Sequence, residues 1–123
     1  MNEQSKALDM IKSVYEDNSA EINGREYVFT SFNHKQRRKV FAYYTQIASQ
    51  LEKGNMSFLD SKEFEHIEKL IEGKVMYDGN LLSVLNKSDQ ENHWNNFGED
   101  YIIFVTTAIS VISYPFLKGS ITS

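Results

Sequence analysis

The chain has 123 residues, of which 41% are hydrophobic and 24% charged, with a net charge of −4 and a pI of about 5.3. This hydrophobic content excludes a disordered chain, and the length predicts one domain around a single core. The acidic balance argues against a dedicated nucleic-acid binder, which usually presents a positive surface. The absence of cysteine excludes disulfides, thiolate metal sites and cysteine nucleophiles.

The first thirty residues predict a helix followed by a hairpin. Apolar residues from Leu8 onward recur at helical spacing and predict a short amphipathic helix over residues 4–16. Asn23-Gly24 accepts the positive φ angles of a type I′ turn, so a β-hairpin is expected there. Tyr27 and Phe29 then lie on one face of its second strand.

Two amphipathic helices are predicted next, over residues 34–53 and 61–72. Asn33 is the expected N-cap of the first helix, within a capping box, and Asp60 the expected N-cap of the second. Gly73 ends the second helix. The apolar stripe of the first helix consists of Val40, Phe41, Tyr44, Ile47, Ala48 and Leu51. Further on, Asp78-Gly79 predicts either a second small hairpin or a loop that enters a short helix.

Residues 101–117 carry no charge. Their β-branched side chains favour a strand, but their length favours a helix, since strands rarely exceed about 10 residues. Glu99 and Asp100 suit a helix N-terminus, and Pro115 is expected to mark its end. We interpret the run as a central helix with Ile102 to Ile112 inside the core. A membrane span is the alternative, but the run barely reaches the minimum length of about 17 residues and contains Ser, Thr and Pro.

The predicted fold class is therefore mainly α, with about four helices around a central C-terminal apolar helix and a short β-hairpin near Asn23-Gly24. Residues 1–123 are expected to form a single domain. Within it, residues 1–20 form an N-terminal helix and loop, and residues 118–123 form a flexible tail. No secretory signal or lipidation motif is recognisable, so a cytoplasmic location is expected.

Catalytic and metal-binding patterns are weak. Glu63 and His66 lie at i, i+3 on one helix and could share a metal, but bundle sites of this kind need the pair repeated on a second helix. The other carboxylates of residues 60–72 alternate with lysines, which is typical of a solvated face. No phosphate loop, nucleophile elbow or zinc signature is present. We therefore predict no enzyme, no metal and no cofactor.

A basic cluster opens the 34–53 helix and opposes the helix dipole; it consists of Lys35, Arg37, Arg38 and Lys39. Three partners could offset it: the acidic helix 61–72 packed antiparallel, an acidic protein partner, or nucleic acid. The last fits least, because no aromatic-bearing strands accompany the cluster. Near the other end, Trp94 is either a plug of the core or a recognition anchor.

Several segments together resemble a phage tail assembly chaperone of long-tailed bacteriophages. The similarity covers about Ile22 to Phe116 and is carried by packing and turn motifs: Ile22–Phe29, Arg37–Tyr44, Ser57–Phe64, His93-Trp94 ahead of Glu99-Asp100-Tyr101, and Ile112–Phe116.

The resemblance implies a small, mostly helical protein of the host cytoplasm that is absent from the virion. Such chaperones coat the tape measure protein and recruit tail-tube subunits, and many have a longer form made by ribosomal frameshifting. It implies no catalytic residue, nucleic acid or membrane. Self-association is compatible with it.

A partner-binding surface can be sketched for such a chaperone. Apolar residues left over once the core is filled would form a groove for a helical partner. The candidates for this groove are Phe32, Tyr43, Phe58, Met76, Tyr77 and Phe97. Arg37 and Arg38 would steer acidic segments of the partner, and Trp94 would serve as an anchor.

Two other classes of function remain open from the residues alone. One is a small phage or bacterial adaptor that engages an acidic partner through the basic cluster. The other is an enzyme or metal protein built on His66 and the neighbouring carboxylates.

Overall fold

The computed structural model describes the backbone of residues 3–121 and the side chains of residues 9–118. The protein is mainly helical, with a small antiparallel sheet. The helices are α1 (Glu3–Asp17), α2 (His34–Glu52), α3 (Lys62–Glu72), α4 (Leu82–Leu85), α5 (His93–Asn96) and α6 (Tyr101–Ile121). The strands are β1 (Ser19–Ile22), β2 (Arg25–Phe29), β3 (Val75–Tyr77) and β4 (Asn80–Leu81). Two 3₁₀ turns, η1 (Ser57–Asp60) and η2 (Gly98–Asp100), precede α3 and α6.

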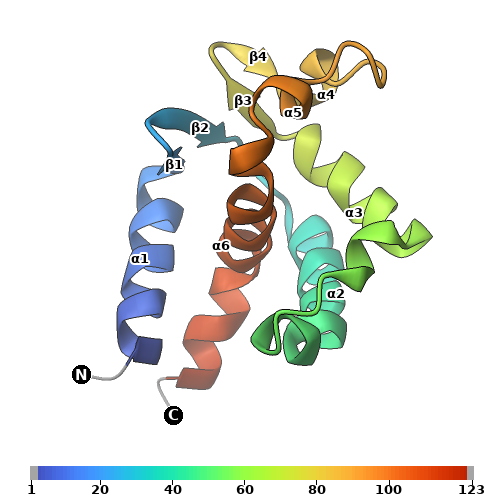
Figure 1. Ribbon diagram of the computed structural model, residues 1–123. Helices are drawn as coiled ribbons and strands as arrows, with labels where there is room; N and C mark the ends of the chain where they lie inside the picture. The colour runs from blue at the N-terminus through green and yellow to red at the C-terminus, as the bar shows by residue number, and fades with distance from the viewer. Residues whose placement is uncertain (1–2, 122–123) are drawn as a thin grey trace.

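Helix α6 lies between α1 on one side and α2 on the other (Figure 1). Helix α3 packs against α2, and the sheet with α4 and α5 covers one end of the bundle. The mainly α fold class is confirmed, but the described residues form six helices where about four were expected, because α4 and α5 add two single turns that the periodicity does not show. The predicted helices near residues 4–16, 34–53 and 61–72 are confirmed.

The sheet has four strands in the order β1-β2-β3-β4, all antiparallel. Both of its hairpin turns have positive φ angles at two successive residues: 52° and 82° at Asn23 and Gly24, and 51° and 80° at Asp78 and Gly79. These are the angles of a type I′ turn, so both turn signals in the sequence are confirmed. The pairing of β2 with β3 joins the two hairpins into one sheet and was not predicted.

The helix caps follow the sequence with one correction. At α2, the Asn33 side chain accepts from the Gln36 backbone N–H while the Gln36 side chain accepts from the Asn33 N–H, which completes the capping box. At α3, the cap is Ser61 and not Asp60, because Asp60 belongs to η1. The Ser61 hydroxyl accepts from the Phe64 backbone N–H at 3.1 Å.

Helix α6 supplies much of the core, as expected. Its buried apolar side chains are Phe104, Val105, Ala108, Ile109, Val111 and Ile112. However, Ile102 and Ile103 are 39% and 46% exposed, so the prediction that the whole run from Ile102 lies inside the core is wrong for its first turn.

The C-terminal end of α6 also differs from the prediction. Pro115 lies inside the helix and does not end it, and residues 118–121 continue the helix where a flexible tail was expected. Residues 122–123 lie outside the described residues, as do Met1 and Asn2 of the predicted N-terminal segment. Because a proline has no backbone N–H, Pro115 cannot donate to the carbonyl of the preceding turn, and α6 lacks one of its backbone hydrogen bonds there. Close to this point the Arg37 guanidinium donates to the Ile112 carbonyl at 3.0 Å and ties α2 to α6.

Within the described residues, one helix is long and apolar enough to cross a bilayer, and it is α6 with its preceding turn. Half of that stretch is buried inside the protein.

A substitution at Gly24 tests the assignment of the first hairpin turn as type I′. Gly24→Ala places a side chain at a φ of 82°, which costs an L-residue about 1–2 kcal/mol, so the free energy of unfolding should fall by that amount. Gly98→Ala is the matched control, because Gly98 has no positive φ and a Cβ there meets open space. Urea unfolding of both variants measures the difference, and equal stability of the two would contradict the turn assignment.

Candidate functional site

A buried carboxylate at the start of α6 holds the hairpin β1–β2 in place. Asp100 is fully buried, and three side chains donate to its carboxylate. Arg25 Nε donates to Oδ2 at 2.7 Å, Asn23 Nδ2 to Oδ1 at 2.7 Å, and Tyr27 Oη to Oδ2 at 2.6 Å. Asn23 is the first of the two turn residues and Arg25 is the first residue of β2, so the type I′ turn places both at the tip of the hairpin, where both reach Asp100.

These contacts keep both Asp100 and Arg25 ionised. Burial alone would raise the pKa of Asp100, but the hydrogen bonds from Arg25, Tyr27 and Asn23 outweigh it and lower the pKa to about 2. The hydrogen bond to Asp100 in turn raises the pKa of Arg25. Arg25 also pairs with the exposed carboxylate of Glu99. The pair is therefore ionised across the whole physiological range.

The same carboxylate orients a histidine on the far side of Tyr27. Because Tyr27 Oη donates its proton to Asp100, it can only accept from His93 Nε2, which lies 2.8 Å away. His93 is therefore the tautomer with its proton on Nε2, and Nδ1 is a bare acceptor. Nδ1 has no hydrogen-bond partner among the described residues, although the His93 side chain is only 7% exposed. Burial lowers the pKa of His93, so the ring is neutral at pH 7.

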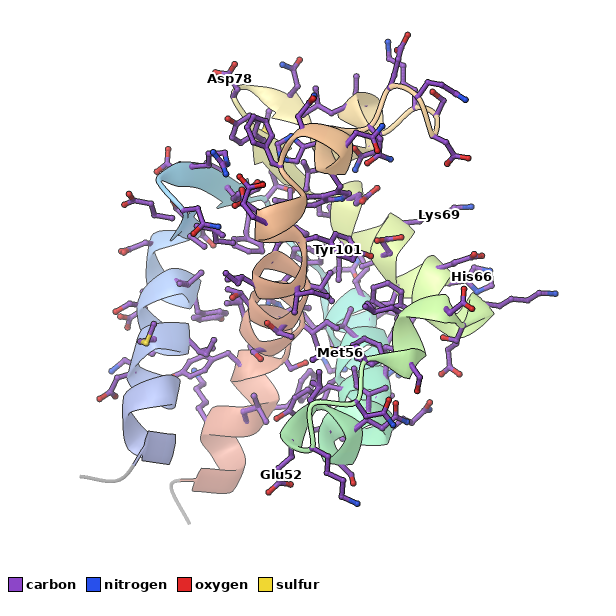
Figure 2. The ribbon with its side chains drawn as sticks, in the orientation of Figure 1. Glu52, Met56, His66, Lys69, Asp78 and Tyr101 are labelled. Atoms are coloured by element: carbon purple, nitrogen blue, oxygen red, sulfur yellow. The ribbon has the colours of Figure 1, made fainter. Side chains whose placement is uncertain are left out.

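His93 lines a cleft of about 360 Å³ between the β3–β4 turn and the segment around α5. The rings of Tyr77 and Phe97 lie against the imidazole, with centroids 4.6 Å and 4.9 Å away. The remaining lining consists of Leu85, uncharged amide side chains and the carboxylates of Asp78 and Glu91. Figure 2 shows Asp78 at the tip of the β3–β4 hairpin. We call this the His93 cleft.

A second cleft, of about 780 Å³, lies between α3 and the segment that follows α4. Its polar wall contains Glu65, Glu68, Lys69, Glu72 and Asp89, and Trp94 and Tyr101 form its aromatic wall. Trp94 Nε1 donates to Glu72 at 3.2 Å, and Tyr101 Oη donates to Glu68.

Glu72 is the titrating group of this second cleft. Burial raises its pKa to about 7 despite the hydrogen bonds from Trp94 and Asn86, and the nearby Glu68 carboxylate adds to the rise. The carboxyl is thus partly protonated at neutral pH. It also links α3 to the Trp94 indole, so its protonation state bears on how these two elements pack.

The predicted partner-binding residues are scattered by the fold. Tyr43 and Phe58 are buried and pack with Phe64 in the core, so the expectation that they remain for an exposed groove is wrong. Phe32 is buried as well. The rings of Tyr43, Phe58 and Phe64 pack together where α2, η1 and α3 meet. Only the half-buried Met76, Tyr77 and Phe97 retain part of the predicted surface, at the sheet end.

Trp94 is half-buried and belongs to the aromatic cluster of the core, stacked 6.1 Å from Tyr27. This placement agrees with the plug interpretation.

The basic cluster does not pair with α3. Among the described residues no ion pair joins the two helices. Arg37 turns inward to the Ile112 carbonyl and lies over the rings of Tyr15 and Phe32, at 5.3 Å and 5.8 Å from their centroids. The other members, Lys35, Arg38 and Lys39, are exposed. Arg37 is thus a packing residue, and the other three form the basic patch.

The candidate metal ligands face solvent. Glu63 and His66 are exposed, and Figure 2 shows His66 on the outer side of α3. Within the described part of the chain no three His, Asp or Glu side chains are grouped to hold a metal ion.

Comparison of the chain with protein-family models, with curated proteins and with solved structures gives no match.

The Arg25–Asp100 pair makes a sharp prediction. Asp100→Asn removes the charge that Arg25 and Tyr27 bind, and we expect the free energy of unfolding to fall by about 2–3 kcal/mol, somewhat less than for a fully buried pair because Arg25 is partly exposed. Glu99→Gln removes an exposed charge from the same arginine and should cost less than about 1 kcal/mol. Urea unfolding at pH 7 distinguishes them, and similar losses in both variants would refute the assignment.

The raised pKa of Glu72 should make the free energy of unfolding depend on pH. A folded-state pKa of about 7 against an ordinary 4.5 means that the folded protein binds this proton more tightly. The resulting contribution is fully present below pH 4.5 and is lost as the pH rises through 7, by roughly 3 kcal/mol. His93, whose pKa is lowered, acts in the opposite sense, so each variant must be compared with the unmodified protein.

The measurement is urea unfolding between pH 5 and pH 8. We compare the free energy of unfolding of Glu72→Gln with that of the unmodified protein. This difference should favour the variant more at pH 8 than at pH 5. Glu65→Gln alters an exposed carboxylate of the same cleft and serves as the control. If the free energy of unfolding of Glu72→Gln runs parallel to that of the unmodified protein across this pH range, burial does not raise the pKa of Glu72.

Proposed function

We propose that the protein is a non-catalytic binding protein of the phage tail assembly chaperone type, which shields the tape measure protein and recruits tail-tube subunits in the host cytoplasm. The observation that carries this proposal is the exposed, uncharged first turn of α6. Ile102 and Ile103 present apolar side chains to solvent on a helix without a charge from 101 to 117. Adjacent exposed apolar side chains of this kind offer a face for a binding partner.

Thr106, one turn further along α6, extends this apolar face. Thr106 Oγ1 donates back to the carbonyls of Ile102 and Ile103, at 3.0 Å and 3.2 Å. A threonine whose hydroxyl is bonded within its own helix adds no free polar group to the surface. We call Ile102, Ile103 and Thr106 the α6 face. Its chemistry suits the apolar side of a partner helix laid alongside it, since docking of amphipathic helices uses such faces.

The basic patch supports the recruitment of acidic partner segments. Lys35, Arg38 and Lys39 are exposed at the N-terminal end of α2 and have no ion-pair partner among the described side chains. Unpaired rim charges of this kind raise association rates more than affinity. The same observation supports a second candidate, a small phage or bacterial adaptor that engages an acidic partner through this patch alone.

Co-expression with the tape measure protein and pull-down at low salt tests the proposal. We expect capture by the unmodified protein and at least a tenfold loss in the Ile102→Asp and Ile103→Asp variants, because a charge on the α6 face must be desolvated on binding. Val84→Asp is the matched control, since Val84 is equally exposed but lies on α4. Circular dichroism verifies that each variant is folded.

Two outcomes would count against the chaperone. One is the absence of any complex, and the other is full capture by Ile103→Asp. If Arg38→Glu abolishes binding of a partner while Ile103→Asp has no effect, the adaptor is favoured instead.

A further inference from the structure

The His93 cleft contains an acceptor that the fold orients but does not use. The chain of hydrogen bonds from Asp100 through Tyr27 places the proton of His93 on Nε2 and leaves Nδ1 as a lone-pair acceptor. The side chain is more than nine-tenths buried and lines the cleft. Nδ1 itself is not among the fully buried side-chain atoms that lack a partner, so it reaches the surface of the cleft, where a donor from outside can bind it.

The walls of the cleft favour a flat group. The rings of Tyr77 and Phe97 flank the imidazole at tilted angles, so a planar donor can stack on an aromatic face while it reaches Nδ1. The cleft volume of about 360 Å³ is at the small end for ligand sites, which suits one long side chain better than a bulky molecule.

The charges that line the cleft exclude an anion. Asp78 and Glu91 contribute two carboxylates, and no lysine or arginine is among the lining residues that the structure describes. The His93 ring is neutral at pH 7, since burial lowers its pKa. Asn80, Gln90 and Asn96 supply further amide oxygens that can accept. The ligand is therefore cationic and rich in N–H donors.

We propose that the His93 cleft binds an arginine side chain presented by a protein partner. A guanidinium is planar, always charged and carries five N–H donors, so it can stack on Tyr77 or Phe97, donate to His93 Nδ1 and pair with Asp78 or Glu91 at once. An ammonium group matches the charge but has no face to stack. The identity of the partner as the tape measure protein rests on the proposed function, whereas the preference for arginine does not.

The molecule already holds one guanidinium against Phe97, a ring that also lines the cleft. Arg25 lies 4.3 Å over the centroid of Phe97 and pairs with Glu99 and Asp100. The His93 cleft offers the same two kinds of group, aromatic rings and carboxylates, in Tyr77, Phe97, Asp78 and Glu91.

The preference is measured by NMR titration of the full-length protein. The probe is a capped pentapeptide, two alanines on each side of arginine, and the same peptide with citrulline or lysine is the comparison. Citrulline keeps the planar shape but loses the charge. We expect the chemical shifts of His93 and Tyr77 to change saturably as the arginine peptide reaches millimolar concentration, a range typical of a peptide this short. The citrulline and lysine peptides should bind at least tenfold more weakly.

Variants locate the site. Asp78→Asn combined with Glu91→Gln should weaken arginine binding about tenfold, and asparagine tolerates the positive φ of position 78. Asp89→Asn is the control, because it removes a charge from the neighbouring second cleft and leaves the His93 cleft intact. Direct ¹⁵N measurement of His93 should find the proton on Nε2 both before and after binding.

Three results would overturn the inference: no saturable shift, equal binding of arginine and citrulline, or an Asp89→Asn effect as large as that of the double variant. The pull-down with the tape measure protein separates it from the proposed function. If the double variant still captures the tape measure protein fully while the peptide result holds, the cleft serves a free small guanidinium compound and the assignment to a protein partner is wrong. If the pull-down fails altogether, the proposed function fails while the arginine preference stands on the titration.

Discussion

The ion pair between Arg25 and the buried carboxylate of Asp100 is the contact on which the rest of the structure depends. It joins two segments that lie 75 positions apart, the first hairpin and the start of α6. Since Asp100 has no access to solvent, its charge is tolerable only because three donors surround it. Tyr27 uses the same carboxylate to set the proton of His93. One ion pair thereby determines both the position of the sheet and the polarity of the His93 cleft.

The two proposed binding surfaces differ in kind. The α6 face is apolar, and its contribution to binding would come from area removed from water. The His93 cleft combines aromatic rings with carboxylates and amides, and its contribution would come from matched donors and charges. A partner helix that carries both an apolar stripe and an arginine could engage both. The region from 60 to 100 carries ten acidic and four basic residues, so it favours basic segments, whereas the patch at the start of α2 favours acidic ones.

The core explains why the predicted groove is absent. Helical spacing on α2 indicated a stripe through Tyr44, but Tyr43 is the deeply buried tyrosine, because η1 folds Phe58 back under the helix and Phe64 closes the gap from α3. Aromatic residues that flank a stripe can pack on either side of it. Which side is covered depends on the path of the next segment, and periodicity within one helix carries no information about that path.

The sequence by itself determined the local elements: both Asn-Gly and Asp-Gly turns, the capping box at Asn33 and the helical character of the run after Tyr101. These follow from interactions among neighbouring residues, through permitted φ angles and nearby donors. Only the tertiary structure decided that Asp100 lies buried, that His93 presents a bare nitrogen and that Ile103 faces solvent. Each of these depends on a side chain from a distant segment, and the free energy of burying a charge or an apolar group is set by those neighbours and not by the residue itself.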